Sequence, residues 1–200
     1  MATVNEPNAA AEGHLAHGAV DLLQILVGIR LRSVSDPESR RHLTWLSDIA
    51  AAMALMARRV EPGGPVDFAG YLEDAIGFWK RSCDPRGIRI DVRASAASLP
   101  STHALPLAII VHELMSNATR HAFAEGANGS IAVACSRAAD GVSLVVRDSG
   151  AGALDLKDGD GLALVRGLVE HLKGMMVVET APGAGVGVRI RLPFDDVLRH

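Results

Sequence analysis

The 200-residue sequence has little cysteine and few aromatic residues. Its two cysteines, Cys83 and Cys135, are far apart and lack the close spacing of metal ligands. This pattern excludes a disulfide framework and a zinc knuckle, fits a reducing compartment, and makes both cysteines candidates for the core. Aromatic residues make up 4% of the chain, too few for the stacking platforms that bind single-stranded nucleic acid.

The sequence also lacks a large excess of charge of one sign and long hydrophobic runs. The chain has 20 Lys and Arg against 23 Asp and Glu, a net charge of −3, so no basic field attracts nucleic acid or an anionic membrane. No segment reaches the roughly 18 consecutive apolar residues of a membrane helix. With 48% hydrophobic residues, the composition is that of a globular protein. We therefore expect a soluble, cytoplasmic protein without nucleic-acid binding or membrane insertion.

The first sixty residues have the apolar spacing of two helices. On the first helix, steps of three and four residues define a stripe formed by Leu15, Ala19, Leu22, Leu26 and Ile29. Residues 33–38 break the pattern, with Ser35 or Asp36 as N-cap and Pro37 at the first helical position. A similar seam runs from Leu43 to Val60. We expect an antiparallel helical hairpin over residues 1–62 that forms a four-helix bundle in a homodimer, because one hairpin buries only one stripe per helix.

The segment 61–65 contains two prolines and two glycines, which cannot continue a helix, and so marks a domain boundary. Beyond it, helical spacing over 68–81, 105–123 and 161–173 alternates with the period-two pattern of strands. The strands are expected at 88–92, 131–135, 142–146, 175–180 and 186–192. Turn residues at 140–141 and 181–185 predict two hairpins. The fold class is therefore α+β, with helices on a mostly antiparallel sheet over residues 66–200.

The helix over 105–123 carries polar residues on one stripe. Glu113 and Asn117 are four residues apart and point the same way, and Arg120 and His121 follow one turn later. A carboxylate, an amide oxygen and two cationic or hydrogen-bonding groups suit a hydrated Mg²⁺ that bridges phosphates. A solvated helix face explains the same stripe when it is taken alone.

Two glycine-containing turns follow. In Asp148-Ser149-Gly150-Ala151-Gly152, a carboxylate at a strand end can accept a hydrogen bond from an exocyclic amine, and glycines let the backbone approach a planar base. In Gly159-Asp160-Gly161-Leu162, glycines at a helix N-terminus leave backbone donors for a phosphate. An ordinary turn and a helix start capped by Asp160 are the alternatives.

Taken together, the three segments resemble the ATP-binding domain of the superfamily that includes gyrase B subunits, mismatch-repair ATPases and sensor histidine kinases. Residues 112–123 resemble the N box, 148–152 the G1 box and 159–162 the G2 box. The amino-acid sequence of these segments is most similar to that of bacterial histidine kinases whose N box ends in His-Ala-Phe. The resemblance implies a Bergerat-type α/β sandwich that binds ATP with Mg²⁺. It implies Glu113 as general base or water-orienting group, Asn117 as Mg²⁺ ligand, Arg120 and His121 near phosphate, and Asp148 on the adenine amine.

The predicted hairpin resembles the dimerisation and phosphotransfer domain of the same kinases. The segment from His17 to Gln24 keeps a histidine and a Leu-Gln pair at the family's separation but lacks its Arg, Lys and Asn residues. His17 is the candidate phosphoacceptor, and Asp21 one turn later can orient its imidazole. A surface histidine on a bundle helix is the alternative, and His14 is a second candidate. The segment between Gly152 and Gly159 is short for the family's nucleotide lid.

The leading prediction is a histidine kinase core that phosphorylates itself and passes the phosphoryl group to the receiver domain of a response regulator. Either a separate sensor protein supplies the input signal, or the chain is a cut-down product. One alternative is a phosphorelay adaptor that keeps the fold but has a degenerate ATPase-like domain. Another is a kinase that phosphorylates a serine on a partner protein, but such kinases usually lack a helical hairpin. Binding of Mg-ATP separates the first two functions.

Overall fold

A five-stranded sheet forms the centre of the ATP-binding half of the chain. The computed structural model describes residues 7–60, 64–95, 98–154 and 159–194, and for residues 7–17 the backbone alone. The strand order is β2-β4-β5-β7-β6. β2 and β4 are parallel, and the other neighbours are antiparallel. The strands are β2 (Ile88–Ala94), β4 (Gly129–Ala138), β5 (Gly141–Asp148), β6 (Met175–Thr180) and β7 (Val186–Pro193). Both predicted hairpins, β4–β5 and β6–β7, are confirmed.

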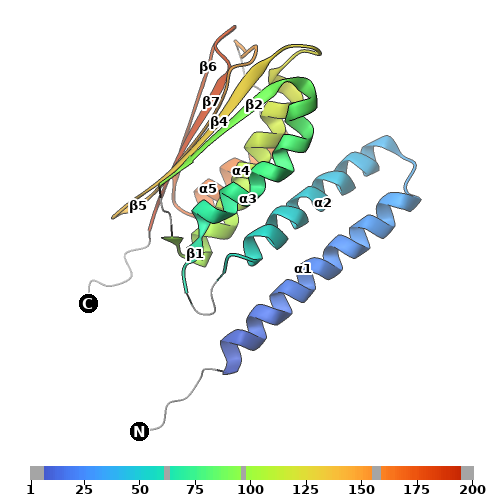
Figure 1. Ribbon diagram of the computed structural model, residues 1–200, viewed down its shortest axis with the longest axis vertical. Helices are drawn as coiled ribbons and strands as arrows, with labels where there is room; N and C mark the ends of the chain where they lie inside the picture. The colour runs from blue at the N-terminus through green and yellow to red at the C-terminus, as the bar shows by residue number, and fades with distance from the viewer. Residues whose placement is uncertain (1–6, 61–63, 96–97, 155–158, 195–200) are drawn as a thin grey trace.

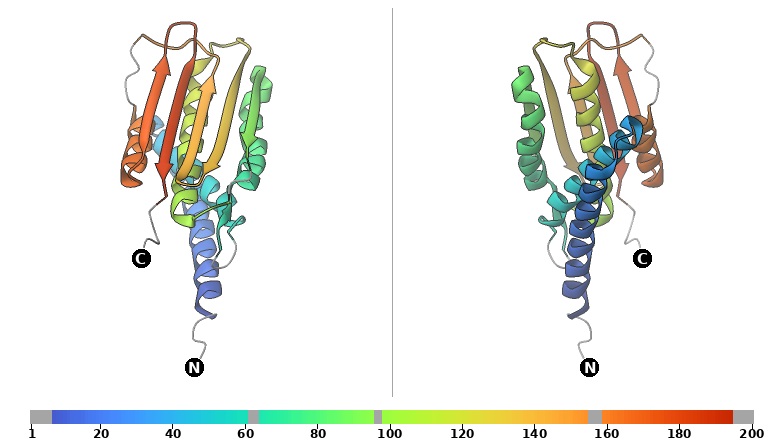
Figure 2. Two further views of the ribbon diagram at one scale, coloured as in Figure 1. Left: turned by 90° about the vertical axis from the view of Figure 1, so that its left-hand side faces the viewer. Right: turned by 90° about the vertical axis from the view of Figure 1, so that its right-hand side faces the viewer.

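Three helices cover one face of this sheet and leave the other face open (Figures 1 and 2). They are α3 (Phe68–Cys83), α4 (Ser101–Asn117) and α5 (Asp160–His171). Alternate strand residues such as Ile131, Leu144 and Ile190 are buried beneath them, as the period-two pattern predicts. Cys83 and Cys135 are both buried in this core and free. Short elements complete the domain: β1 (Val66–Asp67), η1 (Asp84–Arg86), β3 (Ser98–Leu99) and η2 (Ala118–Ala122).

Two long helices precede the sheet domain and lie antiparallel (Figure 1). They are α1 (Pro7–Ser33) and α2 (Pro37–Ala57). The turn between them ends at Asp36, which caps α2 by accepting a hydrogen bond from Ser39 N at 2.7 Å, while Pro37 occupies the first turn. This backbone bond lowers the pKa of the Asp36 carboxyl. α2 lies between α1 and the helices of the sheet domain, so α1 is the outermost layer (Figure 1).

The apolar stripe predicted on α1 is not the face that α1 turns toward α2. Leu22, Leu26 and Ile29 are 56%, 54% and 51% exposed, and Ile25 beside them is also exposed. The opposite side of the helix is covered instead, with Val27 as its buried residue. Within the described residues, the stripe therefore has no cover from the same chain.

Two element boundaries differ from the sequence prediction. Pro106 favours a helix start near residue 105, but α4 begins one turn earlier, at Ser101. The helix predicted over 161–173 ends two residues early, since α5 ends at His171 and Lys173 adopts the left-handed conformation with φ 53°. A Cβ at Gly174 would meet Arg191 O at 2.7 Å and the Leu192 side chain more closely still. Glycine is needed here because the chain passes close to β7, a contact that the sequence of α5 does not reveal.

Gly167, inside α5, and Gly174, just after it, make a matched pair for a stability test. Gly174→Ala should lower the free energy of unfolding by about 1–3 kcal/mol, because the new methyl group overpacks against β7. Gly167→Ala, inside α5 and with open space around its Cβ, should raise it by about 0.5–1 kcal/mol. Urea denaturation followed by circular dichroism measures both. Equal effects of the two substitutions would contradict the close approach of Gly174 to β7.

Candidate functional site

The N-box stripe lies on α4, and the start of α5 packs against it. Glu113 is 3% exposed. A Cβ at Gly161 would lie 2.6 Å from Glu113 Oε2 and within 3.4 Å of both polar atoms of the Asn117 amide. A side chain at position 161 would have to displace the Glu113 carboxylate or the Asn117 amide, whereas glycine fits without a shift. The structure thus brings together Glu113, Asn117 and Gly161, three predicted site residues from two segments of the sequence.

Burial controls the protonation of this end of α4. It raises the pKa of Glu113, although a hydrogen bond from Trp45 and the positive charge of Arg120 oppose the shift. It also lowers the pKa of His112 to about 4, with a further contribution from Arg120. His112 is therefore neutral at physiological pH, and its ring packs beside Phe78 with centroids 5.5 Å apart. We assign His112 a packing role in the α3–α4 contact.

Asp148 is the last residue of β5, and its buried carboxylate accepts hydrogen bonds through one of its two oxygens. Its Oδ1 accepts hydrogen bonds from Gly150 N at 2.8 Å and Val186 N at 3.2 Å. These backbone bonds fix the orientation of the carboxylate and leave Oδ2 without a hydrogen bond from the described residues. An oriented carboxylate with a free oxygen can accept a hydrogen bond from an exocyclic amine.

The glycines that follow Asp148 allow three segments to meet. Gly150 has no room for a Cβ because Ala122 O lies against it, and Ala151 N donates to the same carbonyl at 2.8 Å. Gly152 has φ +60° and packs against Ala181 O. The turn is thereby held between the end of the N box and the β6–β7 turn. Thr180 also fixes this turn by accepting a hydrogen bond from Ala153 N at 2.9 Å, a role that the sequence analysis missed.

The remaining predicted site residues lie in different surroundings, from the buried core to the exposed surface. Gly159 is the N-cap of α5 and has open space around it, so Asp160 is the first helical residue and not the cap. Leu162 is buried in the core. Arg120 lies in η2, a π-helical turn, and its guanidinium is 3.9 Å from Asp48 of α2. His121 is exposed. Residues 155–158 of the predicted lid lie outside the described residues, as does the linker segment 61–63.

Two residues of α2 reach the N box, and the sequence analysis missed both. Trp45 Nε1 donates a 2.6 Å hydrogen bond to Glu113 Oε1. Asp48, three residues later and so on the same side of the helix, faces Arg120. One signal in the sequence could have found Trp45. It is one of only two tryptophans, and it is not among the apolar residues spaced by three and four that form the seam between Leu43 and Val60. An aromatic residue off the seam indicates a second buried face.

His17 belongs to a different layer of the molecule. It lies in α1, whose main packing partner is α2, and its side chain is outside the described part of the structure. α2 separates α1 from α4 (Figure 1). The fold therefore does not bring the backbone of His17 next to Glu113.

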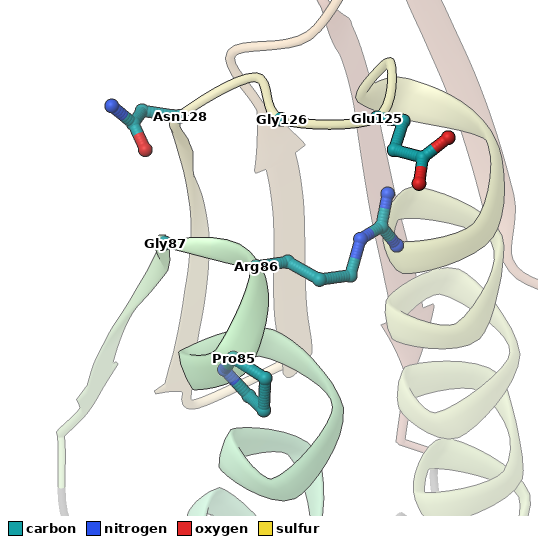
Figure 3. A pocket seen from close by; sticks show the side chains of 6 residues that line it. All are labelled: Pro85, Arg86, Gly87, Glu125, Gly126 and Asn128. Carbon is teal, nitrogen blue, oxygen red and sulfur yellow. The ribbon is translucent and has the colours of Figure 1, made fainter.

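A cavity of about 660 Å³ lies away from these residues, at the end of α3 (Figure 3). Its lining consists of Pro85, Arg86, Gly87, Glu125, Gly126 and Asn128. The Arg86 guanidinium donates to the carbonyl oxygens of Thr119 and Phe123, at the C-terminal end of the N box. Arg86 thus holds η2 in place, and the cavity contains no residue of the predicted site.

The donors around α4 and the two glycine turns fit a magnesium nucleotide. Asn117 and Glu113 supply an amide oxygen and a carboxylate on one face, and the N-terminus of α5 supplies backbone donors beside them. The described residues contain no group of three His, Cys, Asp or Glu side chains that could hold a metal alone. This donor set suits Mg²⁺, which takes few protein ligands and completes its shell with water and phosphate oxygens.

Relatives of known sequence are sensor histidine kinases. The chain is similar to the sensor histidine kinase PdtaS of Mycobacterium tuberculosis, with 35% identity over 115 residues that cover 54% of this chain and 23% of that protein. The PdtaS protein of Mycolicibacterium smegmatis is 33% identical over 114 residues, with the same coverage. The matched region is thus about a quarter of the length of these curated relatives.

Solved structures share the fold. The histidine kinase domain of the blue-light activated histidine kinase EL346 from Erythrobacter litoralis matches with a TM-score of 0.69 and 21% identity, over 88% of this chain and 95% of that domain. A longer structure of EL346 matches with a TM-score of 0.74 over 98% of this chain and 62% of its own. The model of the histidine kinase-like ATPase domain family matches residues 84–191. Because this match covers more than half of the chain, the protein belongs to the histidine kinase-like ATPase domain family.

Proposed function

We propose that this protein is the core of a histidine kinase that uses Mg-ATP to phosphorylate His17 and then passes the phosphoryl group to a response-regulator receiver domain. The contact of Gly161 with Glu113 and Asn117 is the observation that carries the proposal. It joins the N box to the start of α5, where the helix N-terminus attracts phosphate beside Asn117, the proposed Mg²⁺ ligand, and Glu113, the proposed base. Membership of the ATPase family implies ATP binding and so supports this assignment.

Each predicted residue has a stated role in this proposal. Asp148 accepts a hydrogen bond from the adenine amine through Oδ2, and Gly150 and Gly152, which pack against Ala122 O and Ala181 O, hold the turn that follows it beside the base. Asn117 binds Mg²⁺, which neutralises charge on the phosphates. Arg120, His121 and the backbone at Gly159 and Gly161 bind phosphate oxygens. Leu162 anchors α5 in the core so that its N-terminus keeps its position.

The transfer itself requires a neutral imidazole and a proton acceptor. The unprotonated ring nitrogen of His17 forms a bond to the γ-phosphorus, and the bond from that phosphorus to the β–γ bridging oxygen breaks, with its electron pair leaving on ADP. The proton on the other ring nitrogen is released to water or to a base. Glu113 acts as this base or orients the water, and its buried position favours proton acceptance because burial raises its pKa.

We further propose that residues 1–62 form the dimerisation and phosphotransfer domain and residues 66–200 the ATP-binding domain. The exposed apolar face of α1 supports a homodimer, since Leu22, Ile25, Leu26 and Ile29 lie on one side of the helix. A second copy would cover this face in a four-helix bundle. A separate sensor protein is the proposed source of the signal. No helix of the described residues is long and apolar enough to cross a membrane.

The first test concerns nucleotide binding. Asn117→Ala should weaken Mg-ATP binding by about tenfold or more in isothermal titration calorimetry, because a direct metal ligand is lost. Asn128→Ala, which removes an asparagine at the Figure 3 cavity, is the matched control and should bind like the wild type. Absence of Mg-ATP binding in both the wild type and Trp45→Phe, a variant that removes the hydrogen bond from Trp45 to Glu113, would overturn the kinase assignment and leave the phosphorelay adaptor as the function.

The second test concerns the phosphoacceptor. Incubation with γ-labelled ATP should give acid-labile label, as expected for phosphohistidine, and His17→Ala should abolish it. His14→Ala, one helical turn earlier in α1, should retain the label. Undiminished label on His17→Ala would reject His17, and acid-stable label on a partner protein would indicate a serine kinase.

The third test concerns the dimer. Leu26→Glu places a charge in the middle of the exposed face of α1 and should weaken dimerisation by about two orders of magnitude, because an unpaired charge would be buried in the bundle. Val177→Glu, at an exposed apolar site on β6, should leave it unchanged. Analytical ultracentrifugation measures both. A monomeric wild type would remove the support that this face gives to a bundle.

A further inference from the structure

Helix α2 docks on the part of α4 that the proposed function assigns to nucleotide. The two helices pack directly against each other, with Ala50, Ala52 and Met56 of α2 buried. At the upper end of this contact, Trp45 Nε1 donates to Glu113 Oε1 at 2.6 Å, across 68 positions of sequence. The other carboxylate oxygen, Oε2, faces Gly161. Both oxygens of the proposed base are therefore in contact with protein atoms.

The second contact from α2 is with a cation. Asp48 lies 3.9 Å from the guanidinium of Arg120. A carboxylate at this position offers Arg120 the same kind of charge as a phosphate oxygen, so the two compete for one partner. Trp45 and Asp48 thus complement the two charged groups of the site. Trp45 offers a hydrogen-bond donor to the carboxylate of Glu113, and Asp48 offers an acceptor to Arg120.

The two contacts differ in strength. The Asp48–Arg120 pair is long, and its side chains are 30% and 51% exposed, so solvent screens it and it contributes little. The Trp45–Glu113 bond is short, and its acceptor belongs to a residue that is 3% exposed. A hydrogen bond to a buried charged group is among the stronger polar contacts in a protein. Trp45 is therefore the main polar contact between α2 and α4.

We propose that docking of α2 on α4 is an autoinhibited state of the kinase, in which Trp45 masks Glu113 and Asp48 occupies Arg120. Release of α2 frees both groups for nucleotide and for the phosphoacceptor. The position of α1 is consistent with this state, because α2 lies between α1, which carries His17, and α4 (Figure 1). This inference rests on the proposed function, since it concerns access to the same site.

The test compares two Trp→Phe variants of the full chain. Trp45→Phe removes the indole donor and keeps an aromatic ring, and Trp79→Phe makes the same change in the buried core of α3. Calorimetry with Mg-ATP gives the Kd, and γ-labelled ATP gives the initial rate of phosphohistidine formation. Trp45→Phe should tighten Kd and raise the rate by about tenfold, which corresponds to the loss of one hydrogen bond to a charged group. Trp79→Phe should not increase either quantity.

A fluorescence measurement gives a readout that does not depend on turnover. In Trp79→Phe, Trp45 is the only tryptophan, and its emission should change when Mg-ATP displaces it from Glu113. Asp48→Asn provides a second variant if Trp45→Phe does not fold, and it should raise the rate in the same direction by a smaller factor.

The results distinguish failure of the autoinhibition inference from failure of the proposed kinase function. If the wild type binds Mg-ATP but Trp45→Phe has the same Kd and rate, or a lower rate, α2 is not inhibitory and the inference alone is overturned. A lower rate with unchanged Kd would make Trp45 a residue that orients Glu113. If neither the wild type nor Trp45→Phe binds Mg-ATP, the proposed function fails first and the inference fails with it. Binding by Trp45→Phe alone would support both.

Discussion

The buried carboxylate of Glu113 is the constraint around which the rest of the structure is arranged. A carboxylate inside a packed helix layer is costly unless donors or positive charges offset the loss of water. Here Trp45 donates to it and Arg120 contributes positive charge. The start of α5 passes so close that a side chain at residue 161 would displace the Glu113 carboxylate. One contact of α2, the approach of α5 at Gly161 and the raised pKa of the site all involve this one group.

Much of the sheet domain could be predicted from the sequence because its signals are local. Strands with a period of two, turn residues at 140–141 and 181–185, and the Asp36 cap each depend on neighbours only a few positions away. The candidate nucleotide residues were predicted for a related reason. Glu113 and Asn117 share a helix face by spacing alone, and Gly161 opens the next helix. Their meeting in space needed the structure, because no local pattern specifies how closely α5 approaches α4.

The errors and omissions all involve contacts between distant segments. The apolar stripe through Leu22 and Leu26 was identified correctly as apolar, but hydrophobic spacing does not tell which partner covers it. Trp45 and Asp48 were passed over because they fall outside the seam of α2, and their partners are far away in sequence. Gly174 is required by packing on β7 and not by its backbone conformation, since the left-handed residue is Lys173.

The layering of the molecule has a consequence for how inhibition and dimerisation relate. α2 uses one side to contact α4, and the exposed apolar residues of α1 lie on the side of that helix opposite to its buried Val27. The face proposed for a second copy is therefore separate from the face that masks Glu113. Release of α2 from α4 breaks the Trp45 and Asp48 contacts without uncovering the α1 face. A hairpin arranged in this way can change the access of nucleotide to α4 while the dimer stays intact, so a signal needs to overcome only the contacts of α2 with α3 and α4.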